Sequence, residues 1–334
     1  MKRVTLLPGD GIGPEITDAT IKVLEAAGVK ITWDIVPGGM TSFKKTGNPL
    51  PDETIESFKK NKVLLKGPLT TPVGGGYKSV NVSLRQRFDL FVNVRPAISI
   101  PGVKSNFKDI DLLVIRENTE DIYSADERYT GPDRSTAEAT FKVTRAASER
   151  IVRYAFEEAG RRKKKKLTLV HKANILKCTS GLFLEVGAKV AREFPKIKYE
   201  EKIVDNMCMQ LVINPHQFDV IVTTNLFGDI LSDLTAGLVG GLGVAPGANI
   251  GKGYAMFEAV HGTAPDIAGK GVANPTAQIL AACMMLDYMG ETKNGERIRS
   301  AVKSIISKGK SVTKDLSGRA TTTQFTKAVI DALE

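Results

Sequence analysis

The stretch "VTLLPGDGIGPEI", residues 4–16, passes from a strand pattern to a helix pattern through a glycine-rich turn. Val4–Leu7 are mostly apolar and end at a proline, which is typical of a short buried strand. Apolar residues then recur at helical spacing from Ile16 to Gly28, and Pro14 suits a first helical turn. The stretch therefore predicts a strand followed at once by a helix, the unit from which α/β proteins are built.

The alternation of strand and helix patterns continues along the chain. Residues 29–36 and 63–65 have strand patterns, and a helix pattern between them ends at 57–60. Later apolar runs each end in polar residues, at 112–115, 167–170 and 220–222. We expect an α/β fold with a mainly parallel sheet and ligand binding at the carboxyl ends of its strands. Residues 125–140 are polar and irregular, which predicts an excursion from the main body.

Length and composition indicate a large soluble protein. The 334 residues favour two lobes over one compact core. The hydrophobic content of 42% is ordinary, no apolar run approaches the ~18 residues of a membrane span, and the N-terminal residues do not predict a signal peptide. Cys178, Cys208 and Cys283 are far apart and lack zinc-site spacing, so we expect reduced thiols in a cytosol-like compartment.

The formal net charge of +10 has two interpretations. One is a basic surface that binds nucleic acid or a membrane, and the other is a site for a polyanionic small molecule. The densest basic run, 161–166, lies between an amphipathic helix pattern and an apolar strand, and no aromatic residue interleaves it for stacking on bases. We interpret the run as a surface connection and expect neither nucleic acid nor a membrane as a partner.

Several common catalytic patterns are missing from the sequence. Glycines 9, 11 and 13 do not have the G-x-G-x-x-G spacing, and no Walker, G-x-S-x-G, H-E-x-x-H or C-x-x-C pattern occurs. A standard Rossmann dinucleotide site and a Walker-type NTPase are therefore not expected.

Two aspartates form a candidate metal site. Asp229 and Asp233 are spaced to share a helix face, and we place them in the first turn of a helix after Gly228. Paired carboxylates hold hard divalent ions such as Mg²⁺, and Asp205, at the end of another strand pattern, is a possible third ligand. Acids that stabilise a helix N-terminus are the commoner explanation of such spacing, and Asp205 alone reads equally well as an N-cap.

Four arginines form a candidate anion site. Arg85, Arg87 and Arg95 lie close in the sequence, and Arg116 ends a strand pattern. Guanidinium groups bind carboxylates through paired hydrogen bonds, so the cluster suits a substrate with several carboxylates, and surface arginines are the alternative. A helical segment would place Asn81 and Arg85 on one face, whereas a strand would instead align the first two arginines.

Three further side chains are candidates for proton transfer or ligand contact. Tyr123 and Lys177 become useful only where a nearby cation, a metal or burial lowers the pKa. His261, in the loop "HGTAPDIAG" at 261–269, is most simply a packed histidine, with a general base or a ligand contact as alternatives.

Seven segments in this order resemble the metal-dependent β-decarboxylating dehydrogenases, the isocitrate/isopropylmalate family. Members act on isocitrate, 3-isopropylmalate, homoisocitrate and tartrate. The segments are "LLPGDGIGPEI" (6–16), "KGPLTTPVGGGYKSVNVSLRQRFDLFVNVRP" (66–96), "IRENTEDIY" (115–123), "HKANILK" (171–177), "NLFGDILSDL" (225–234), "GGLGVAPGANIG" (240–251) and "FEAVHGTAPDIAGKGVANP" (257–275).

The resemblance implies a two-domain, non-Rossmann α/β fold. Residues 1–90 and 241–334 would form a large cofactor-binding domain, and 91–240 a small domain for substrate and dimerisation. Residues around 124–141 would form the clasp through which dimers of the family interlock. A homodimer at least is expected, with each active site shared between subunits, in the cytoplasm or, for a processed eukaryotic chain, the mitochondrial matrix.

The resemblance also implies a role for each candidate. It assigns the substrate carboxylates and their surroundings to Ser79, Asn81, Arg85, Arg95 and Arg116. It assigns Mg²⁺ or Mn²⁺ to Asp229 and Asp233, with Asp205 from the partner. Lys177, also from the partner, would help to take the hydroxyl proton, and Tyr123 would protonate the carbon that loses CO₂.

The residues before the first arginine select the substrate in this family. Ser79 and Asn81 resemble the isocitrate enzymes, where polar groups meet a carboxylate, whereas isopropylmalate enzymes carry an apolar residue there. The expected activity is oxidative decarboxylation of isocitrate to 2-oxoglutarate and CO₂. Homoisocitrate, one methylene longer, and 3-isopropylmalate are the alternatives. A regulatory paralogue without catalysis is a further one, but such subunits tend to lose substrate or metal residues that this chain retains.

The resemblance implies that the "HGTAP" loop binds the adenosine half of the cofactor. The implied cofactor residues are Thr70, Glu258, His261, Gly262, Thr263, Ala264, Asp266, Ile267, Ala273 and Asn274. NADP enzymes carry lysine and tyrosine where this chain has Asp266 and Ile267, and a carboxylate accepts hydrogen bonds from a ribose but repels a 2′-phosphate. We therefore expect NAD, although Lys314 and Arg319 could retain some affinity for NADP.

Overall fold

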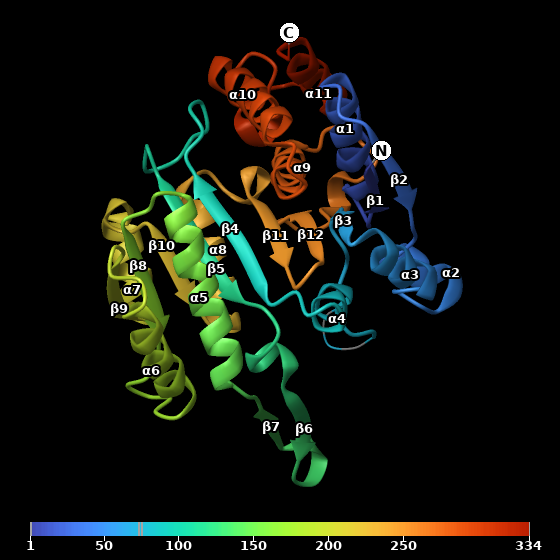
Figure 1. Cartoon of the computed structure of the whole chain (residues 1–334). Coiled ribbons are helices and arrows are strands. Elements are labelled where there is room, and N and C mark those ends of the chain that lie inside the picture. Colours follow the sequence, from blue (N-terminus) through green and yellow to red (C-terminus); the bar gives the residue numbers. More distant parts are fainter. Residues whose placement is uncertain (1, 73, 75, 334) are drawn as a thin grey trace.

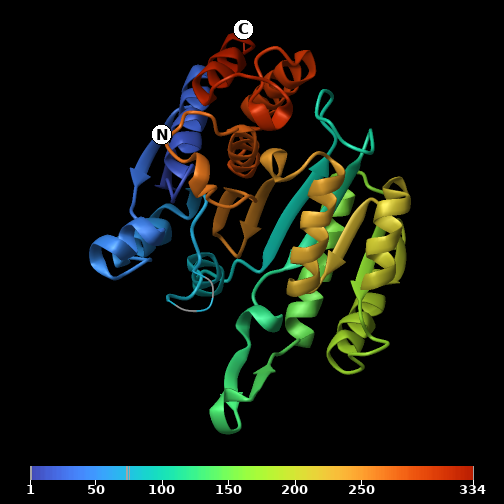
Figure 2. The ribbon, with the colours of Figure 1, turned by 180° about the vertical axis from the view of Figure 1, so that it is seen from behind.

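The computed structural model describes residues 2–72, 74 and 76–333, and its core is a single ten-stranded sheet (Figures 1 and 2). The strand order is β2-β1-β3-β12-β11-β4-β5-β10-β8-β9. The strands are β1 (Lys2–Leu7), β2 (Ile31–Ile35), β3 (Val63–Lys66), β4 (Val92–Ile98), β5 (Asp111–Glu117), β8 (Lys166–His171), β9 (Lys198–Ile203), β10 (Val220–Thr223), β11 (Pro246–Ile250) and β12 (Ala255–Ala259).

The sheet is parallel on both flanks and antiparallel at its centre. Strand β11 pairs antiparallel with β12 and β4, and β4 pairs antiparallel with β5, whereas the other neighbours are parallel. The connections from β4 to β5 and from β11 to β12 contain no helix, so the chain turns back beside itself. The prediction of a mainly parallel sheet is confirmed on the flanks, and the antiparallel centre was not foreseen.

Helices cover both faces of the sheet. One face packs against α1 (Gly13–Ala26), α5 (Arg145–Arg161), α6 (Thr179–Ala191), α9 (Thr276–Tyr288), α10 (Thr292–Lys308) and α11 (Thr322–Asp331). The other packs against α3 (Asp52–Asn61), α4 (Val80–Arg87), α7 (Val204–Ile213) and α8 (Asn225–Leu238). The short α2 (Gly39–Thr46) precedes α3. Figure 1 shows α5 in front of the sheet, and Figure 2 shows α8 in front of it. Within the described ranges, no helix has both the length and the apolar character to cross a membrane.

The opening turn is built against the histidine loop, far away in the sequence. Strand β1 ends at Leu7 and α1 begins at Gly13, as predicted. The backbone N–H of Ile12 donates to the carbonyl of Thr263 over 2.9 Å. Gly11 has φ of +58°, and a Cβ there would lie 2.0 Å from that same carbonyl oxygen. Only glycine permits this approach, which joins the turn to the loop that follows β12.

The predicted excursion is a regular hairpin. Strands β6 (Asp126–Thr130) and β7 (Thr136–Thr140) pair antiparallel with each other and with no other strand. The hairpin projects from one end of the molecule, and nearly all of its residues are exposed (Figure 1). The prediction of an excursion was correct, but the segment is a regular hairpin and not irregular. Its polar side chains are exposed on both faces of the two strands.

The predicted division of the chain corresponds to two contiguous runs of strands. Residues 1–90 and 241–334 supply β2, β1, β3, β12 and β11, and 91–240 supply β4, β5, β10, β8 and β9. One continuous sheet joins these runs between β11 and β4. That they act as two domains stays a prediction.

The structure also tests the predictions for the basic run, the cysteines and the helix that carries the two aspartates. The basic run 161–166 connects α5 to β8 on the surface, as interpreted from the sequence. The three cysteines are free, as expected. Helix α8 begins at Asn225, four residues before the start predicted after Gly228, so Asp229 and Asp233 lie in its second and third turns. The helix dipole acts mainly within the first turn, so it does not explain these acids.

Candidate active site

Three arginines from separate elements converge beside α8. Arg116, at the end of β5, is buried and donates to the Asn225 side-chain oxygen over 2.9 Å from Nε and 2.6 Å from Nη2. Its Nη1 is bound to a carboxylate oxygen of Asp229. A Cβ on Gly228 would lie 2.4 Å from Cγ of Arg116, so glycine lets the helix pass directly over the arginine stem.

Arg95, on β4, bridges the strand and the helix. Its Nε donates to Asn93 over 2.7 Å, and its Nη1 donates to Ser232 over 2.9 Å and to Asp233 over 3.3 Å. Burial, with repulsion from Arg116 and Arg85, lowers the pKa of Arg95 to about 10. The side chain is still a cation at neutral pH, and the mutual repulsion of the three guanidiniums favours a bound anion.

Asp229 lies at the centre of the cluster. Its carboxylate accepts hydrogen bonds from Arg116 and from the Tyr123 hydroxyl, and it lies 3.7 Å from Arg95. Burial opposes its ionisation, but the charge of Arg116 and the hydrogen bond from Tyr123 outweigh burial and lower the pKa of Asp229. Burial raises the pKa of Asp233 instead. The two carboxylates of the candidate metal pair therefore differ in their environments.

Tyr123 is protonated at neutral pH. Burial and the hydrogen bond to Asp229 raise the pKa of Tyr123, although the Arg116 guanidinium lies 4.8 Å from the ring centre. The condition set from the sequence, a lowered pKa, is not met here, because the Tyr123 hydroxyl is desolvated and donates to a carboxylate, and both effects raise its pKa. A neutral phenol held in one orientation suits a proton donor.

Arg85, on α4, faces a buried ion-pair network. Its Nη2 lies 3.4 Å from Glu258, whose other carboxylate oxygen lies 2.8 Å from Nζ of Lys66. Burial opposes ionisation of Glu258, but Lys66 and Arg85 outweigh it and hold the pKa of Glu258 far below its usual range. Asn249 donates to Glu258 over 2.7 Å. Lys66 and Asn249 were not predicted from the sequence. The local pattern that could have indicated Lys66 is a lysine at the end of an otherwise apolar strand.

Two buried polar atoms near Arg85 have no partner among the described residues. They are the side-chain oxygen of Asn81 and Nε of Arg85 itself. The helical alternative for this segment is the correct one, so these side chains lie one turn apart on α4. Ser79 caps the helix, accepting from the N–H of Val82 over 3.5 Å. A buried donor and a buried acceptor without partners indicate that a polar ligand belongs here.

Two predicted site residues lie outside this cluster. Lys177 is exposed in the loop between β8 and α6. Asp205 is exposed near the start of α7, where its carboxylate is 2.5 Å from Nζ of Lys172. Across the described ranges, no group of three or more His, Cys, Asp and Glu residues is placed to hold a metal ion. Within the single chain, Lys177 and Asp205 therefore lie away from the cluster, which consists of Arg85, Arg95, Arg116, Tyr123, Asp229 and Asp233.

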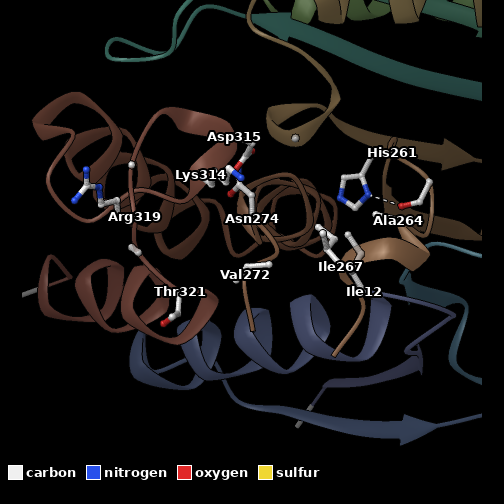
Figure 3. Close-up of a pocket in the computed structure, with 14 residues that line it drawn as sticks. Ile12, His261, Ala264, Ile267, Val272, Asn274, Lys314, Asp315, Arg319 and Thr321 are labelled. Carbon is white, nitrogen blue, oxygen red and sulfur yellow. Dashed lines mark hydrogen bonds between the residues drawn. The ribbon is translucent and has the colours of Figure 1, made fainter. Parts of the chain in front are cut away.

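A cavity of about 1150 Å³ lies beside the histidine loop (Figure 3). Five of the predicted cofactor residues line it: His261, Gly262, Ala264, Ile267 and Asn274. Lys314 and Arg319, the possible contacts for NADP, also line it. The lining does not include Thr70, Glu258, Thr263, Asp266 or Ala273.

His261, which lines this cavity, has one ring nitrogen without a partner among the described residues. Its Nδ1 is 2.9 Å from the carbonyl of Gly262, which fixes Nδ1 as the protonated nitrogen. The buried Nε2 then has a free lone pair, and no described residue pairs with it. Burial lowers the pKa of His261, so the ring is neutral at pH 7. A neutral acceptor suits a ligand N–H or O–H group.

Two acids that the sequence analysis missed support this cavity. Glu15 on α1 accepts from the N–H groups of Gly271 over 3.3 Å and of Ala273 over 3.1 Å. Asp315 accepts from the Asn274 side chain over 2.8 Å. Both hold the segment 271–274 in place, and their separation from it in the sequence left no local signal.

Apolar side chains are exposed on α7 and α8. Met209, Val212 and Ile213 on α7 and Ile230 on α8 are each at least half exposed. Helix α7 contacts α8, so the side chains belong to adjoining helices on one face of the molecule. Apolar surface gathered in this way indicates contact with another protein surface.

Comparison with known proteins agrees with this geometry. A family model described as isocitrate/isopropylmalate dehydrogenase matches residues 3–332. An Arabidopsis thaliana protein, named as a mitochondrial catalytic subunit of NAD isocitrate dehydrogenase, is 49% identical over 98% of this chain and 88% of its own. A Dictyostelium discoideum protein, named as a mitochondrial regulatory subunit of NAD isocitrate dehydrogenase, is 47% identical over 99% of this chain and 91% of its own.

A solved structure extends the likeness to the whole fold. The crystal structure of isocitrate dehydrogenase from Methylococcus capsulatus superposes with a TM-score of 0.98 at 55% identity, covering 100% of this chain and 99% of that one. The α/β fold of the isocitrate/isopropylmalate dehydrogenase type, expected from the sequence, is thereby confirmed. The chain belongs to the isocitrate/isopropylmalate dehydrogenase family.

Proposed function

We propose that the chain catalyses NAD-dependent oxidative decarboxylation of isocitrate to 2-oxoglutarate and CO₂. The observation that carries this proposal is the convergence of Arg85, Arg95 and Arg116 on Asp229. Three cations in a largely buried site match a substrate with three carboxylates. Catalytic and regulatory relatives are similarly close, so the residues and not the names favour catalysis.

The unpartnered atoms of α4 support isocitrate over its analogues. The Asn81 oxygen and Arg85 Nε lack partners, and the polar Ser79 lies at the start of the same helix. An alkyl group placed there would leave these polar atoms unpaired. A substrate carboxylate would accept from Arg85 Nε, and a substrate hydroxyl or carboxylic acid group would donate to the Asn81 oxygen. Homoisocitrate has the same groups on a longer chain and is the second candidate.

Asp229 and Asp233 fit two ligands of a divalent cation. They project from one side of α8 beside the arginines, and hard oxygen donors are what Mg²⁺ and Mn²⁺ prefer. Asp205 is exposed elsewhere in the chain, which fits its delivery from a second subunit. When bound, such an ion offsets the negative charge that develops on the substrate as CO₂ leaves.

The side chains then divide the remaining work. The arginines would hold the substrate carboxylates and orient the C2 hydrogen toward the nicotinamide, and NAD, when bound, would supply the hydride acceptor. Lys177 of a second subunit would assist removal of the hydroxyl proton. Tyr123 is held by Asp229 as a neutral phenol and would deliver a proton to C3 after decarboxylation.

The cavity beside the histidine loop fits the adenosine half of NAD. It is larger than a typical small-ligand pocket, and the free lone pair of His261 accepts a ligand N–H or O–H. Asp266 is exposed on the loop and does not line the cavity, so its contact with the ribose remains a proposal. Its carboxylate would repel a 2′-phosphate across the mouth.

We further propose a homodimer that interlocks through the β6–β7 hairpin, with the small domain (91–240) at its centre and the large domain (1–90 and 241–334) outside. The exposed apolar side chains of α7 and α8 support this arrangement. The cytoplasm and the mitochondrial matrix both stay predictions for the compartment.

The test is absorbance of the reduced cofactor with Mg²⁺ and each substrate in turn. Fast reduction of NAD by isocitrate, with slow reduction by homoisocitrate and 3-isopropylmalate, is expected. Preference for homoisocitrate would move the function to the second candidate. No turnover of any of the three by the pure chain would overturn a catalytic role and favour a regulatory one.

A paired substitution tests the cofactor assignment. D266K/I267Y is expected to raise kcat/KM for NADP by about tenfold or more, because a cation replaces a repelling anion. Asp331→Lys, an equal charge change on α11 outside the cavity, is the control. An equal response of both variants would show that general charge, and not the loop, sets the preference.

A further inference from the structure

A second cavity, of about 680 Å³, lies on the opposite face of the sheet from the arginine site. Alternation along β4 establishes the two sides. Arg95 and Ala97 face α8, whereas Pro96 and Ile98 line this cavity beneath α5, α9 and α10. None of the groups assigned to substrate, metal or cofactor above reaches it.

The floor of this cavity is apolar. It is formed by Ile100 after β4, by Leu280 and Met284 on α9, and by Val244. Ile100, Leu280 and Val244 are almost fully buried, so the floor that they form is rigid. Such a floor suits a flat or branched apolar group and offers nothing to a hydrated inorganic ion.

The rim is cationic. Arg161 and Arg162 at the end of α5, and Arg299 and Lys303 on α10, line the cavity, and Asp287 is the single acid among its described lining residues. Asp287 pairs with both Nη atoms of Arg299, over 2.9 and 3.1 Å, so this guanidinium is fixed in the wall.

Three rim cations remain to face a ligand. Arg161 and Arg162 share one carboxylate, that of Glu158, over 2.7 and 2.5 Å. Lys303 is exposed and has no ion partner within 4.0 Å among the described residues. The charge at the mouth is therefore positive, above a floor that is apolar.

We propose that this cavity binds a small organic anion, in which a phosphate, sulfonate or carboxylate group meets Arg161, Arg162 and Lys303 while an apolar body covers Met284. The chemistry of the two surfaces defines this class of ligand. A purely apolar molecule would leave the cationic rim unpaired, and an inorganic anion would leave the apolar floor uncovered.

The cavity also joins the two runs of strands. Arg161, Arg162 and the residues from β4 belong to 91–240, whereas α9 and α10 belong to 241–334. An occupant that contacts both would restrain their separation, and with it the arginine site on the other face. The effect on the arginine site rests on the proposed function, whereas the proposal of a binding site in this cavity does not.

The probe is 8-anilinonaphthalene-1-sulfonate, an aromatic sulfonate whose fluorescence rises in apolar surroundings. It is titrated into the full chain with saturating NAD present, so that the cofactor cavity is blocked. R161Q/K303Q is expected to weaken the NAD-resistant binding by about tenfold. K165Q/K308Q removes the same charge from exposed residues outside the cavity and is expected to bind as the wild type does.

Equal affinity in both double variants would overturn the site. Phenyl phosphate and benzoate, added as competitors, distinguish which anionic group is preferred, and displacement by inorganic phosphate alone would overturn the apolar half of the proposal. A probe-dependent change in KM for isocitrate that R161Q/K303Q abolishes is expected for the coupling. If the probe binds but the KM for isocitrate does not change, the proposed coupling is wrong and the proposed binding site stands.

Discussion

Asn249 joins the central strands of the sheet through its side chain. Its oxygen accepts from Asn93 over 2.9 Å and from Asn118 over 3.0 Å, while its nitrogen donates to Glu258. These contacts run from the strand that carries Glu258 to the strand that carries Arg95. Arg95 in turn donates to Asn93, so one buried amide links Glu258, proposed to contact the cofactor, with Arg95, proposed to bind the substrate.

Asn249→Ala is expected to lower the free energy of unfolding by about 3 kcal/mol or more, because each buried partner left unsatisfied costs about 1–3 kcal/mol. Urea denaturation at a fixed protein concentration measures the change. Asn174→Ala, at an exposed position, should be neutral. A loss below about 1 kcal/mol would mean that water enters and replaces the amide.

Tyr123→Phe separates the roles of the phenol. Removing the hydroxyl is expected to lower kcat by about 10²-fold or more while KM for isocitrate changes little, because the proton donor acts after binding. Steady-state NADH formation and 2-oxoglutarate yield measure the two steps. A rise in KM at unchanged kcat would show that the hydroxyl only positions Asp229.

His261 gives a pH dependence of stability with a defined sign. Its pKa is lowered from 6.5 by burial, so below pH 6.5 the unfolded chain binds a proton that the folded chain does not. Stability must therefore fall as the pH decreases from 6.5 toward the folded pKa. The free energy of unfolding without cofactor, measured from about pH 7 to about pH 5, should fall less steeply in His261→Gln. Identical slopes would refute this assignment.

At the scale of elements, the β6–β7 hairpin needs a partner. Its described residues are almost all exposed, and a lone two-stranded hairpin is at best marginally stable in water. Arg134 lies 5.2 Å from the Tyr129 ring and Arg128 pairs with Glu138 over 3.4 Å, but both contacts are solvated. In the proposed dimer, a second chain that covers the hairpin would supply the missing burial.

Replacing residues 126–140 by a short glycine linker is expected to convert the dimer to a monomer that retains its helical content and loses activity. Sedimentation velocity, circular dichroism and the NADH assay measure these properties. Arg128→Ala, which removes only an exposed ion pair worth about 0–1 kcal/mol, should remain dimeric. A dimeric deletion variant would move the interface to α7 and α8 alone.

At the scale of the molecule, the proposed sharing of each active site between two subunits makes a quantitative prediction. Tyr123 and Asp229 would act in their own subunit, whereas Lys177 would act in the partner's site. Refolding Tyr123→Phe together with Lys177→Met therefore yields hybrid dimers with one intact site. With random pairing, about a quarter of the wild-type activity is expected to return.

The matched control mixes Tyr123→Phe with Asp229→Asn. Both substitutions then fall on the same side of the site, so every site in a hybrid dimer carries one of them and no activity returns. Activity is measured after co-refolding equal amounts of the two chains. Recovery in the control, or none in the test pair, would refute the proposed sharing.

The sequence by itself determined the class of fold and supplied the candidate residues of the proposed site. Strand and helix periodicity, together with polar residues after the strands, predicted an α/β fold with ligands at the carboxyl ends of parallel strands, and Arg116 does lie at the end of such a strand while the acids of α8 follow another. These signals are local, so they can be read along the chain. His261 and Asn274, which line the cavity beside the histidine loop, were predicted from the family resemblance of the segment 257–275 and not from periodicity.

Only the tertiary structure decided the remainder. Lys66, Asn249, Glu15 and Asp315 act through partners distant in the sequence, and nothing local distinguishes them from ordinary polar residues. The antiparallel centre of the sheet likewise follows from how β4 and β11 meet. The neutral state of Tyr123 depends on burial and on Asp229, because a pKa reflects everything that surrounds the group and not the residue alone.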